Sequence, residues 1–389
     1  MTWVAHLVET VTGDVGARLE IATETGTWNY PLNDTESWSV KVKKDSLRKI
    51  DPRWWKWYRA SILVSWERQD GSLVPWLLGP IIDLPQETRE VATLKCEGVG
   101  AILERRVVLP RDYGADGEYQ GDWQALARTH VYREGRSLGS IAQDVVELST
   151  NRKLGGRLPI RYASPREHGS EYNQRTYFGY NLANNNTWKR LKELSGVIMG
   201  PDIRFQPEFT DDEQTHVQWA MYHGTARQPT IAQDWTMDLD TTSSRAAIAT
   251  VVSRSDASNL ANRVYWTGAG EDEGTLVRMV QDTRPLGQND PLLEAVGSTS
   301  DSDNPSLLTS HALAALAAGE RPLQQLTITV DGSDPRSEIG RWRPGDLANV
   351  TIGDDWLSIE PGTHVLKLIA AKGDWATSIV DLEFQEVMM

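Results

Sequence analysis

The chain has 389 residues, of which 39% are hydrophobic and 24% are charged, and its 40 basic and 54 acidic side chains leave a net charge of −14. This composition is too apolar for a disordered chain and too polar for a membrane protein. The length predicts about two to three domains, and the acidic balance argues against a protein that wraps DNA, because phosphate binding needs clustered positive charge.

Residues 1–110 are typical of β structure. Apolar and polar residues alternate at 17–22, 38–42, 61–68 and 90–98, which predicts half-buried strands. Asp70-Gly71, between two such runs, predicts a hairpin. Asn33-Asp34 and Gly79-Pro80 predict further turns. Short strands at this spacing indicate a small barrel or sandwich.

Residues 111–230 change in character. A turn-rich linker is predicted at 111–122. Apolar residues spaced three or four apart predict an amphipathic helix at 137–150. A second helix is predicted at 184–196, with Asn186 or Thr187 as N-cap and Gly196 as its end. Strands are then expected near 202–209 and at 215–224.

Residues 231–389 return to β structure and hold most of the excess charge. Strands are predicted at 246–255 and in three runs near the C-terminus, a polar loop at 297–306, and a helix at 309–319 that begins at Thr309 or Ser310 and ends at Gly319. This segment contains 11 basic and 24 acidic side chains, a net charge of −13, whereas residues 1–230 are almost neutral. Such a field repels polyanions, although ordinary solubility explains it equally well.

The aromatic composition is unusual, with 16 Trp, 11 Tyr and only 4 Phe. Tryptophan combines a large apolar area with one N–H donor, which suits interfaces. It also fills cores, and the composition alone leaves both interpretations open. The single cysteine, Cys96, rules out an internal disulfide and a multi-cysteine zinc site. Its strand-like surroundings indicate a buried structural residue.

Motifs for catalysis or cofactor binding are missing from the sequence. No phosphate-binding loop, no metal-binding histidine spacing and no nucleophile elbow occurs. We therefore expect no enzyme activity, no cofactor and no metal site, although a glycosidase carboxylate pair is not excluded by spacing. The N-terminus has no secretory signal, and no stretch approaches the ~18 apolar residues of a membrane span.

One segment is a candidate interaction surface. Trp54, Trp55, Trp57 and Tyr58 are interleaved with basic residues at 51–59. These aromatic side chains are suited to stacking on a sugar, and with the basic residues they are suited to gripping nucleic acid. A protein contact, or an ordinary strand with one face in the core, explains the segment as well.

Three stretches resemble minor tail proteins of long-tailed bacteriophages. They are G-A-R-L-E-I through W-S-V-K-V at the N-terminus, N-T-W-K-R-L-K-E-L-S-G-V-I-M-G-P-D-I-R-F at 186–205, and W-R-P-G-D-L-A-N-V-T-I at 342–352. In order and pattern the chain is similar to the tail-hub (baseplate hub) family, particularly its members from phages of actinobacterial hosts. Each motif alone is weak, because P-G-D turns occur in many β proteins.

The resemblance implies an α+β, mainly β fold with two small tube-like antiparallel β-barrel domains and an intervening α/β domain. The first barrel would be 1–110, the α/β domain 111–230, and the second, acidic β-rich domain 231–389. An alternative division makes the second barrel discontinuous, formed by 206–239 plus 321–389.

The same resemblance implies a structural role in the virion, at the tail tip, after assembly in the host cytoplasm. Such hubs form a homotrimer that joins the sixfold distal tail protein to threefold tip proteins, with the tape measure protein and other minor tail or receptor-binding proteins as neighbours. DNA would cross the lumen without specific binding. The alternative function is a carbohydrate- or receptor-binding module that uses Trp54, Trp55, Trp57 and Tyr58.

Overall fold

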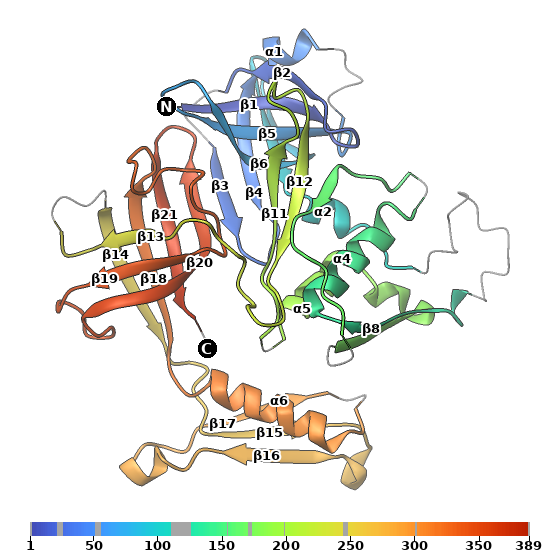
Figure 1. Ribbon diagram of the computed structural model, residues 1–389, viewed down its shortest axis with the longest axis vertical. Coiled ribbons are helices and arrows are strands. Elements are labelled where there is room, and N and C mark those ends of the chain that lie inside the picture. Colours follow the sequence, from blue (N-terminus) through green and yellow to red (C-terminus); the bar gives the residue numbers. More distant parts are fainter. Residues whose placement is uncertain are drawn as a thin grey trace. The chain divides into compact units, whose positions relative to one another are not determined.

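The computed structural model describes residues 2–21, 26–50, 56–109, 126–153, 155–169, 173–197, 199–243, 248–299 and 302–387 (Figure 1). The chain divides into two compact units. The first comprises Met1–Val251, Thr327–Gly353 and Pro361–Met389, and the second comprises Val252–Leu326 and Asp354–Glu360. These limits do not coincide with the limits 110 and 230 expected from the sequence.

Most of the structure is β, and most neighbouring strands are antiparallel, so the α+β, mainly β class is confirmed. Within the described residues, 13 strands share one sheet, and three smaller sheets have two or three strands each. The parallel pairs are β12 with β9, β13 with β19, and β15 with β17.

The N-terminal strands form the first part of the large sheet. They are β1 (Thr2–Glu9), β2 (Val15–Leu19), β3 (Thr27–Pro31), β4 (Ser37–Lys43), β5 (Ala60–Glu67), β6 (Leu73–Glu87) and β7 (Val91–Glu97), with the short helices α1 (Lys44–Arg48) and α2 (Gly100–Leu103). The hairpin at Asp70-Gly71 is confirmed, because β5 and β6 pair on either side of it and Gly71 has a φ of 81°.

The turn expected at Gly79-Pro80 is wrong, since both residues lie inside β6. At this point β6 changes partner: Pro80 is opposite Ser61 of β5, and Ile81 is opposite Cys96 of β7. A Cβ atom at Gly79 would lie 1.8 Å from the carbonyl oxygen of Glu97. Glycine is therefore required by close backbone approach and not by a chain reversal.

The strands β2, β1, β5, β6, β7 and β4 follow one another in a curved sheet. Its two ends meet at the isolated bridge between Ile21 and Val42, beside a hydrogen bond from Lys43 N to Glu20 O. One bridge is not a continuous ladder, so the described residues form no closed barrel here. The predicted pair of barrels is not confirmed.

The C-terminal strands continue the same sheet. They are β13 (Met237–Asp240), β14 (Ile248–Asp256), β18 (Leu323–Asp331), β19 (Leu347–Ile352), β20 (Gly362–Asp374) and β21 (Ile379–Glu386). The first half of β20 pairs with β19 and its second half with β3, while β21 pairs along the other side. The pairing of β3 with β20 therefore joins the first and last parts of the chain in one sheet.

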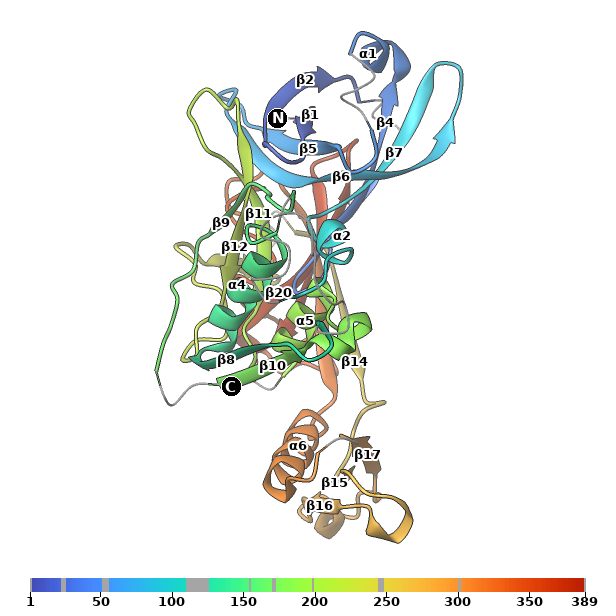
Figure 2. The same cartoon turned by 90° about the vertical axis from the view of Figure 1, so that its right-hand side faces the viewer.

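The α/β part of the first unit contains β8 (His130–Arg136), α4 (Leu138–Ser149), β9 (Ile160–Tyr162), β10 (Asn173–Phe178), the 3-10 helix η1 (Gly179–Asn184), α5 (Thr187–Ser195), β11 (Ile203–Phe209) and β12 (Val217–His223). Both predicted helices are confirmed. The side chains of Ser137 and Asn186 cap α4 and α5, and Gly196 ends α5. The two helices pack with the β11–β12 hairpin around one apolar core (Figure 2). The linker predicted at 111–122 lies outside the described residues.

The second unit has a three-stranded sheet of β16 (Val277–Gln281), β15 (Arg263–Thr267) and β17 (Glu294–Ser298), with α6 (Pro305–Ala318) packed against it and the short turns η2 (Asp272–Gly274) and η3 (Leu286–Gln288). α6 begins four residues before the expected start. The side chain of Asn304 accepts hydrogen bonds from Ser306 N and Leu307 N, and Pro305 occupies the first helical position. The predicted end at Gly319 is confirmed.

Candidate interaction surfaces

The structure describes half of the predicted aromatic site. Trp54 and Trp55 lie outside the described residues. The Trp57 side chain is 52% exposed, whereas Tyr58 is half-buried and has a φ of 60°. The guanidinium of Arg105 lies 4.9 Å from the centre of the Tyr58 ring. Of the two described residues, only Trp57 therefore offers a largely open aromatic surface.

Most of the other tryptophans are core residues. Of those that the structure describes, nine are buried: Trp3, Trp28, Trp38, Trp66, Trp76, Trp188, Trp219, Trp342 and Trp375. Trp76 is at the centre of a group of edge-to-face contacts, with ring centres 5.5 Å from Trp28, 5.5 Å from Tyr30 and 5.1 Å from Trp342. The interpretation of tryptophan as core filler is confirmed for these nine.

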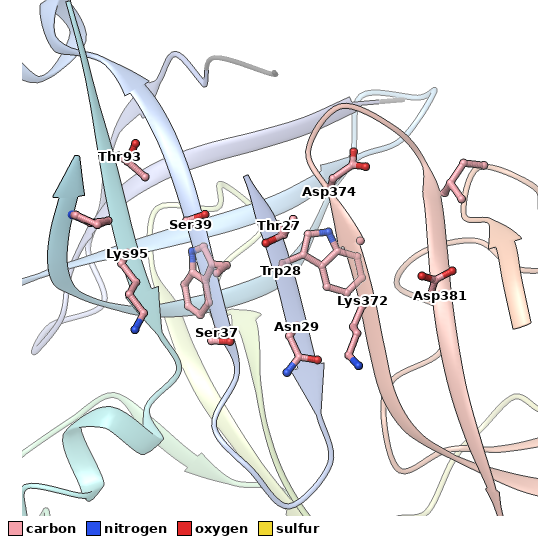
Figure 3. A pocket seen from close by; sticks show the side chains of 14 residues that line it. Thr27, Trp28, Asn29, Ser37, Ser39, Thr93, Lys95, Lys372, Asp374 and Asp381 are labelled. Carbon is pink, nitrogen blue, oxygen red and sulfur yellow. The ribbon is translucent and has the colours of Figure 1, made fainter. Parts of the chain in front are cut away.

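A polar groove lies against the same sheet, and two of the core tryptophans, Trp28 and Trp38, are among the residues that line it (Figure 3). Its volume is about 730 Å³, and it extends over β7, β4, β3, β20 and β21. Because successive side chains alternate between the faces of a strand, Thr27 and Asn29 share one face of β3, while Trp28 between them is buried. Ser37 and Ser39 flank the buried Trp38 in the same way.

Strand pairing brings the groove residues together, because β3 from the first part of the chain pairs with β20 from the last part. Asn29 is opposite Ser37 on one side and opposite Lys372 on the other, and Lys372 is opposite Asp381. The side chains labelled in Figure 3 come from strands at both ends of the sequence. Residues some 340 positions apart thus form one continuous polar wall.

The charges along this wall nearly cancel. Lys372 is paired with Glu383, and Lys95 lies 3.4 Å from Glu97. The Asp381 carboxylate accepts a hydrogen bond of 2.7 Å from Thr329, and the Asp374 carboxylate accepts from the backbone N–H groups of Ala376 and Thr377. The two lysines and two aspartates of the lining carry no net charge, so the groove attracts neither sign of polyelectrolyte strongly.

The P-G-D turn noticed in the sequence is confirmed as a turn before β19. Gly345 has a φ of 102°, a conformation that suits glycine. Asp346 accepts hydrogen bonds from Arg343 N at 2.8 Å and from the buried Arg204 guanidinium at 2.9 Å. Burial lowers the pKa of Arg343 to about 10. The turn is therefore held to β11 by buried charged hydrogen bonds.

The groove residues were visible in the sequence only as the polar members of alternating strands. The pattern T-W-N-Y at 27–30 and S-W-S-V at 37–40 shows which residues share a face. It does not show that β3 pairs with β20.

In the part of the chain that the structure describes, no three His, Cys, Asp or Glu side chains are grouped to hold a metal ion. The described helices include none of the length and apolarity needed to cross a bilayer.

No protein-family model and no curated protein sequence matches the chain. Solved structures do match it. A tail protein from Neisseria meningitidis MC58 superposes with a TM-score of 0.55 at 16% identity, covering 99% of this chain and 97% of that chain. The 43 kDa tail protein of prophage MuSo2 from Shewanella oneidensis gives a TM-score of 0.57 at 9% identity, covering 98% of both chains.

A prophage tail protein from Listeria monocytogenes EGD-e gives a TM-score of 0.52 at 8% identity, covering 99% of this chain and 94% of that chain. Identities this low establish a shared fold and no more. The chain has a fold that is found in phage tail proteins, and the likeness extends over nearly the whole of each chain.

Proposed function

We propose that this chain is a structural, non-catalytic component of a bacteriophage virion, acting as a hub at the tail tip. The observation that carries the proposal is the fold shared with tail proteins over 94–98% of their length. The order of motifs noted in the sequence, from the N-terminal strands to the P-G-D turn, supports the same role.

The proposed hub is a homotrimer. The large sheet contains six strands on each side of β3: β1, β2 and β4–β7 on one side, and β13, β14 and β18–β21 on the other. In this proposal, two groups of six strands in each of three copies supply six groups around an axis, in the place of the two tube-like barrels that the hub resemblance implies. Such a ring suits a sixfold distal tail protein on one side and threefold tip proteins on the other. The tape measure protein and other minor tail or receptor-binding proteins are the further partners of this proposal.

The polar groove is the proposed wall of the channel that DNA crosses. The balance of two lysines and two aspartates in its lining supports this assignment, because a wall that bound phosphate would hold the DNA back. The acidity of residues 231–389 is concentrated elsewhere: the second unit contains 13 acidic and 5 basic side chains. We therefore assign the channel to the groove and not to the whole acidic segment.

Light scattering after size exclusion, over a concentration series, tests this function. We expect a species of three times the chain's 43.5 kDa that grows with concentration, and a ring with a central channel in electron micrographs. A chain that stays monomeric at every concentration would contradict the trimeric hub. It would favour the alternative, a carbohydrate- or receptor-binding module, and the effect of Trp57→Ala in a glycan-binding screen would then be decisive.

A further inference from the structure

The second unit contains an apolar pocket of about 520 Å³ that its own core does not fill. The last turns of α6, the start of β15 and the segment 282–293 surround it. Its apolar lining includes four leucines and two prolines: Leu260, Leu293, Leu313, Leu316, Pro285 and Pro291. Leu313 is 53% exposed although it lies on a helix that packs against a sheet. Apolar surface of this kind marks a binding site when it is contiguous.

Hydrogen bonds hold the pocket open. The Asn262 side chain is buried, its Nδ2 donates to Pro291 O at 2.9 Å, and its Oδ1 accepts from Leu293 N at 2.9 Å. The backbone carbonyl of Asn262 accepts from Asp282 N at 2.8 Å. The side chain of Asn262 therefore fixes one end of the segment that forms one wall, and its backbone carbonyl fixes the other, so the pocket exists before any partner arrives.

Acidic side chains surround the opening of the pocket. Asp282, Asp290 and Glu320 face a single cation, Arg284. The Arg284 guanidinium is already paired with Asp282 at 2.7 Å and with Glu320 at 3.0 Å. The rim thus keeps an excess of negative charge, in a unit that is itself strongly acidic. A matching partner has an apolar group flanked by basic residues.

The first unit of the same chain has such a group on its surface. Phe178 and Tyr180 are 43% and 69% exposed, and their rings stack with centres 5.1 Å apart and an interplanar angle of 20°. Between them, Gly179 N donates to Thr129 O at 2.7 Å, and a Cβ atom at Gly179 would lie 1.9 Å from Leu126 O. The backbone under the two rings is therefore anchored, and the aromatic pair projects from a fixed base.

Basic side chains lie around this aromatic pair. Arg128 is exposed and precedes Thr129, the residue bonded to Gly179. Lys189 Nζ donates to Asn184 Oδ1 at 2.8 Å, at the end of η1. Arg190 donates to Asn185 Oδ1 at 2.8 Å, but it is mostly buried and already paired with Glu193, so Lys189 is the more exposed cation of the two. Residues 126–197 contain 12 basic and 6 acidic side chains, in a chain whose net charge is −14.

We infer that the pocket of one copy binds the Phe178–Tyr180 pair of a neighbouring copy. The volume lies within the ~300–1,000 Å³ range of pockets that enclose drug-sized molecules, and two aromatic rings are of that size. The basic surroundings of the pair match the acidic rim. A knob and a pocket on different parts of one chain make a heterologous contact, which generates a closed ring when the rotation closes. This inference rests on the proposed function, in which copies surround a channel.

Paired substitutions test the contact on the full-length chain. Tyr180→Ala and Leu313→Glu are each expected to weaken self-association at least tenfold, because an aromatic anchor and its pocket dominate an interface. Tyr132→Ala is the matched control for the first, since Tyr132 is an exposed aromatic residue of β8 outside the stacked pair. Leu307→Glu is the control for the second, since Leu307 is exposed on α6 but does not line the pocket. Both controls should stay within about twofold of the wild type.

A charge exchange tests the rim. Glu320→Lys and Lys189→Glu should each weaken association. A chain that has both substitutions reverses the charge on both sides of the contact, so it should recover association in part.

A cross-link identifies the copies involved. Because Cys96 is buried, chains with Tyr180→Cys and differently tagged chains with Leu313→Cys have no other accessible thiol, and a bismaleimide should join one of each.

The outcomes separate this inference from the proposed function. A trimer that forms normally in both Tyr180→Ala and Leu313→Glu would overturn the contact and leave the hub intact. A cross-link found only within a chain that has both cysteines would also overturn it. A wild-type chain that never associates would contradict both the contact and the trimeric hub.

Discussion

The Arg204 guanidinium lies 2.9 Å from the Asp346 carboxylate, and the two residues are 142 positions apart in the chain. Arg204 belongs to β11, and Asp346 closes the P-G-D turn before β19. Arg204 also donates to the carbonyl of Pro344 at 2.8 Å, and Arg343 lies over the Trp76 ring, 4.3 Å from its centre. The Asp346 carboxylate thus compensates the positive charges of Arg204 and Arg343, which are buried where β11 of the α/β part meets the large sheet.

Replacement of this carboxylate should destabilise the first unit strongly. Asp346→Ala leaves the Arg204 charge buried without its partner, which typically costs 3–5 kcal/mol. We expect the urea midpoint, followed by tryptophan fluorescence, to fall accordingly. Asp212→Ala, at an exposed position in the β11–β12 turn, is the control and should change stability by less than about 0.5 kcal/mol. An Asp346→Ala protein as stable as this control would show that the pair contributes little.

Truncation at the centre of the aromatic core should be similarly costly. Trp76 has no exposed surface and contacts four other aromatic rings, those of Trp3, Trp28, Tyr30 and Trp342. Trp76→Ala is expected to lower the free energy of unfolding by about 3–5 kcal/mol, because it leaves a large cavity. Trp57→Ala, at a half-exposed tryptophan, is the matched control and should have a small effect. Equal losses for both variants would contradict the assignment of Trp76 to the core.

Local sequence patterns predicted most helices and strands, because the periodicity of buried residues reports directly on which face is covered. The spacing of Leu138, Ile141 and Val145 predicted α4, and Asn186 was one of two caps proposed for α5. The start of α6 was missed because the Asn304-Pro305 pair lies in a polar run that was interpreted as loop. The error at Gly79-Pro80 arose because a glycine needed for close backbone approach has the same sequence signature as one needed for a turn.

Local sequence patterns could not predict which strands pair when those strands are far apart in the chain. Nothing near Trp28 or Gly373 indicates that these residues are opposite each other, so the groove was not predicted. The exposed Phe178–Tyr180 stack was also missed, since its exposure depends on how β10 and η1 pack. The segment at 54–58 was predicted as an interaction surface because its aromatic residues are adjacent in sequence. Whether an aromatic side chain is exposed depends instead on how the surrounding strands pack.

If the groove lines the channel, the size of a reagent decides whether it can react with a cysteine placed in the groove. Lys95 is exposed in the groove, and Lys95→Cys should react with a small maleimide in both the monomer and the ring. A maleimide attached to a polymer wider than a DNA duplex should react readily with the monomer and poorly with the ring. Gln69→Cys, at the exposed β5–β6 turn, is the control for a site outside the groove. If Lys95→Cys reacts with the polymer-linked maleimide equally well in the monomer and in the ring, the groove lies outside the channel.

A buried carboxyl group predicts how stability depends on pH. Glu36 lies between β3 and β4, and its carboxyl packs so closely against Gly98 that a Cβ there would lie 1.7 Å from a Glu36 oxygen. Burial raises the pKa of Glu36 to about 8, above the usual 4.5. The folded state therefore holds a proton that the unfolded chain releases between these two values.

The sign of the effect follows from this linkage. The stabilisation is fully present below pH 4.5 and is lost as the pH rises towards 8, by an amount on the order of a few kcal/mol. We expect the urea midpoint of the wild type to fall between pH 5 and pH 8.5. Glu36→Gln keeps the shape of the side chain but cannot ionise, so its midpoint should fall less and exceed that of the wild type at pH 8.5. If both proteins lose stability in parallel over this range, other groups cause the decline and the Glu36 carboxyl has nearly the same pKa in the folded and unfolded states.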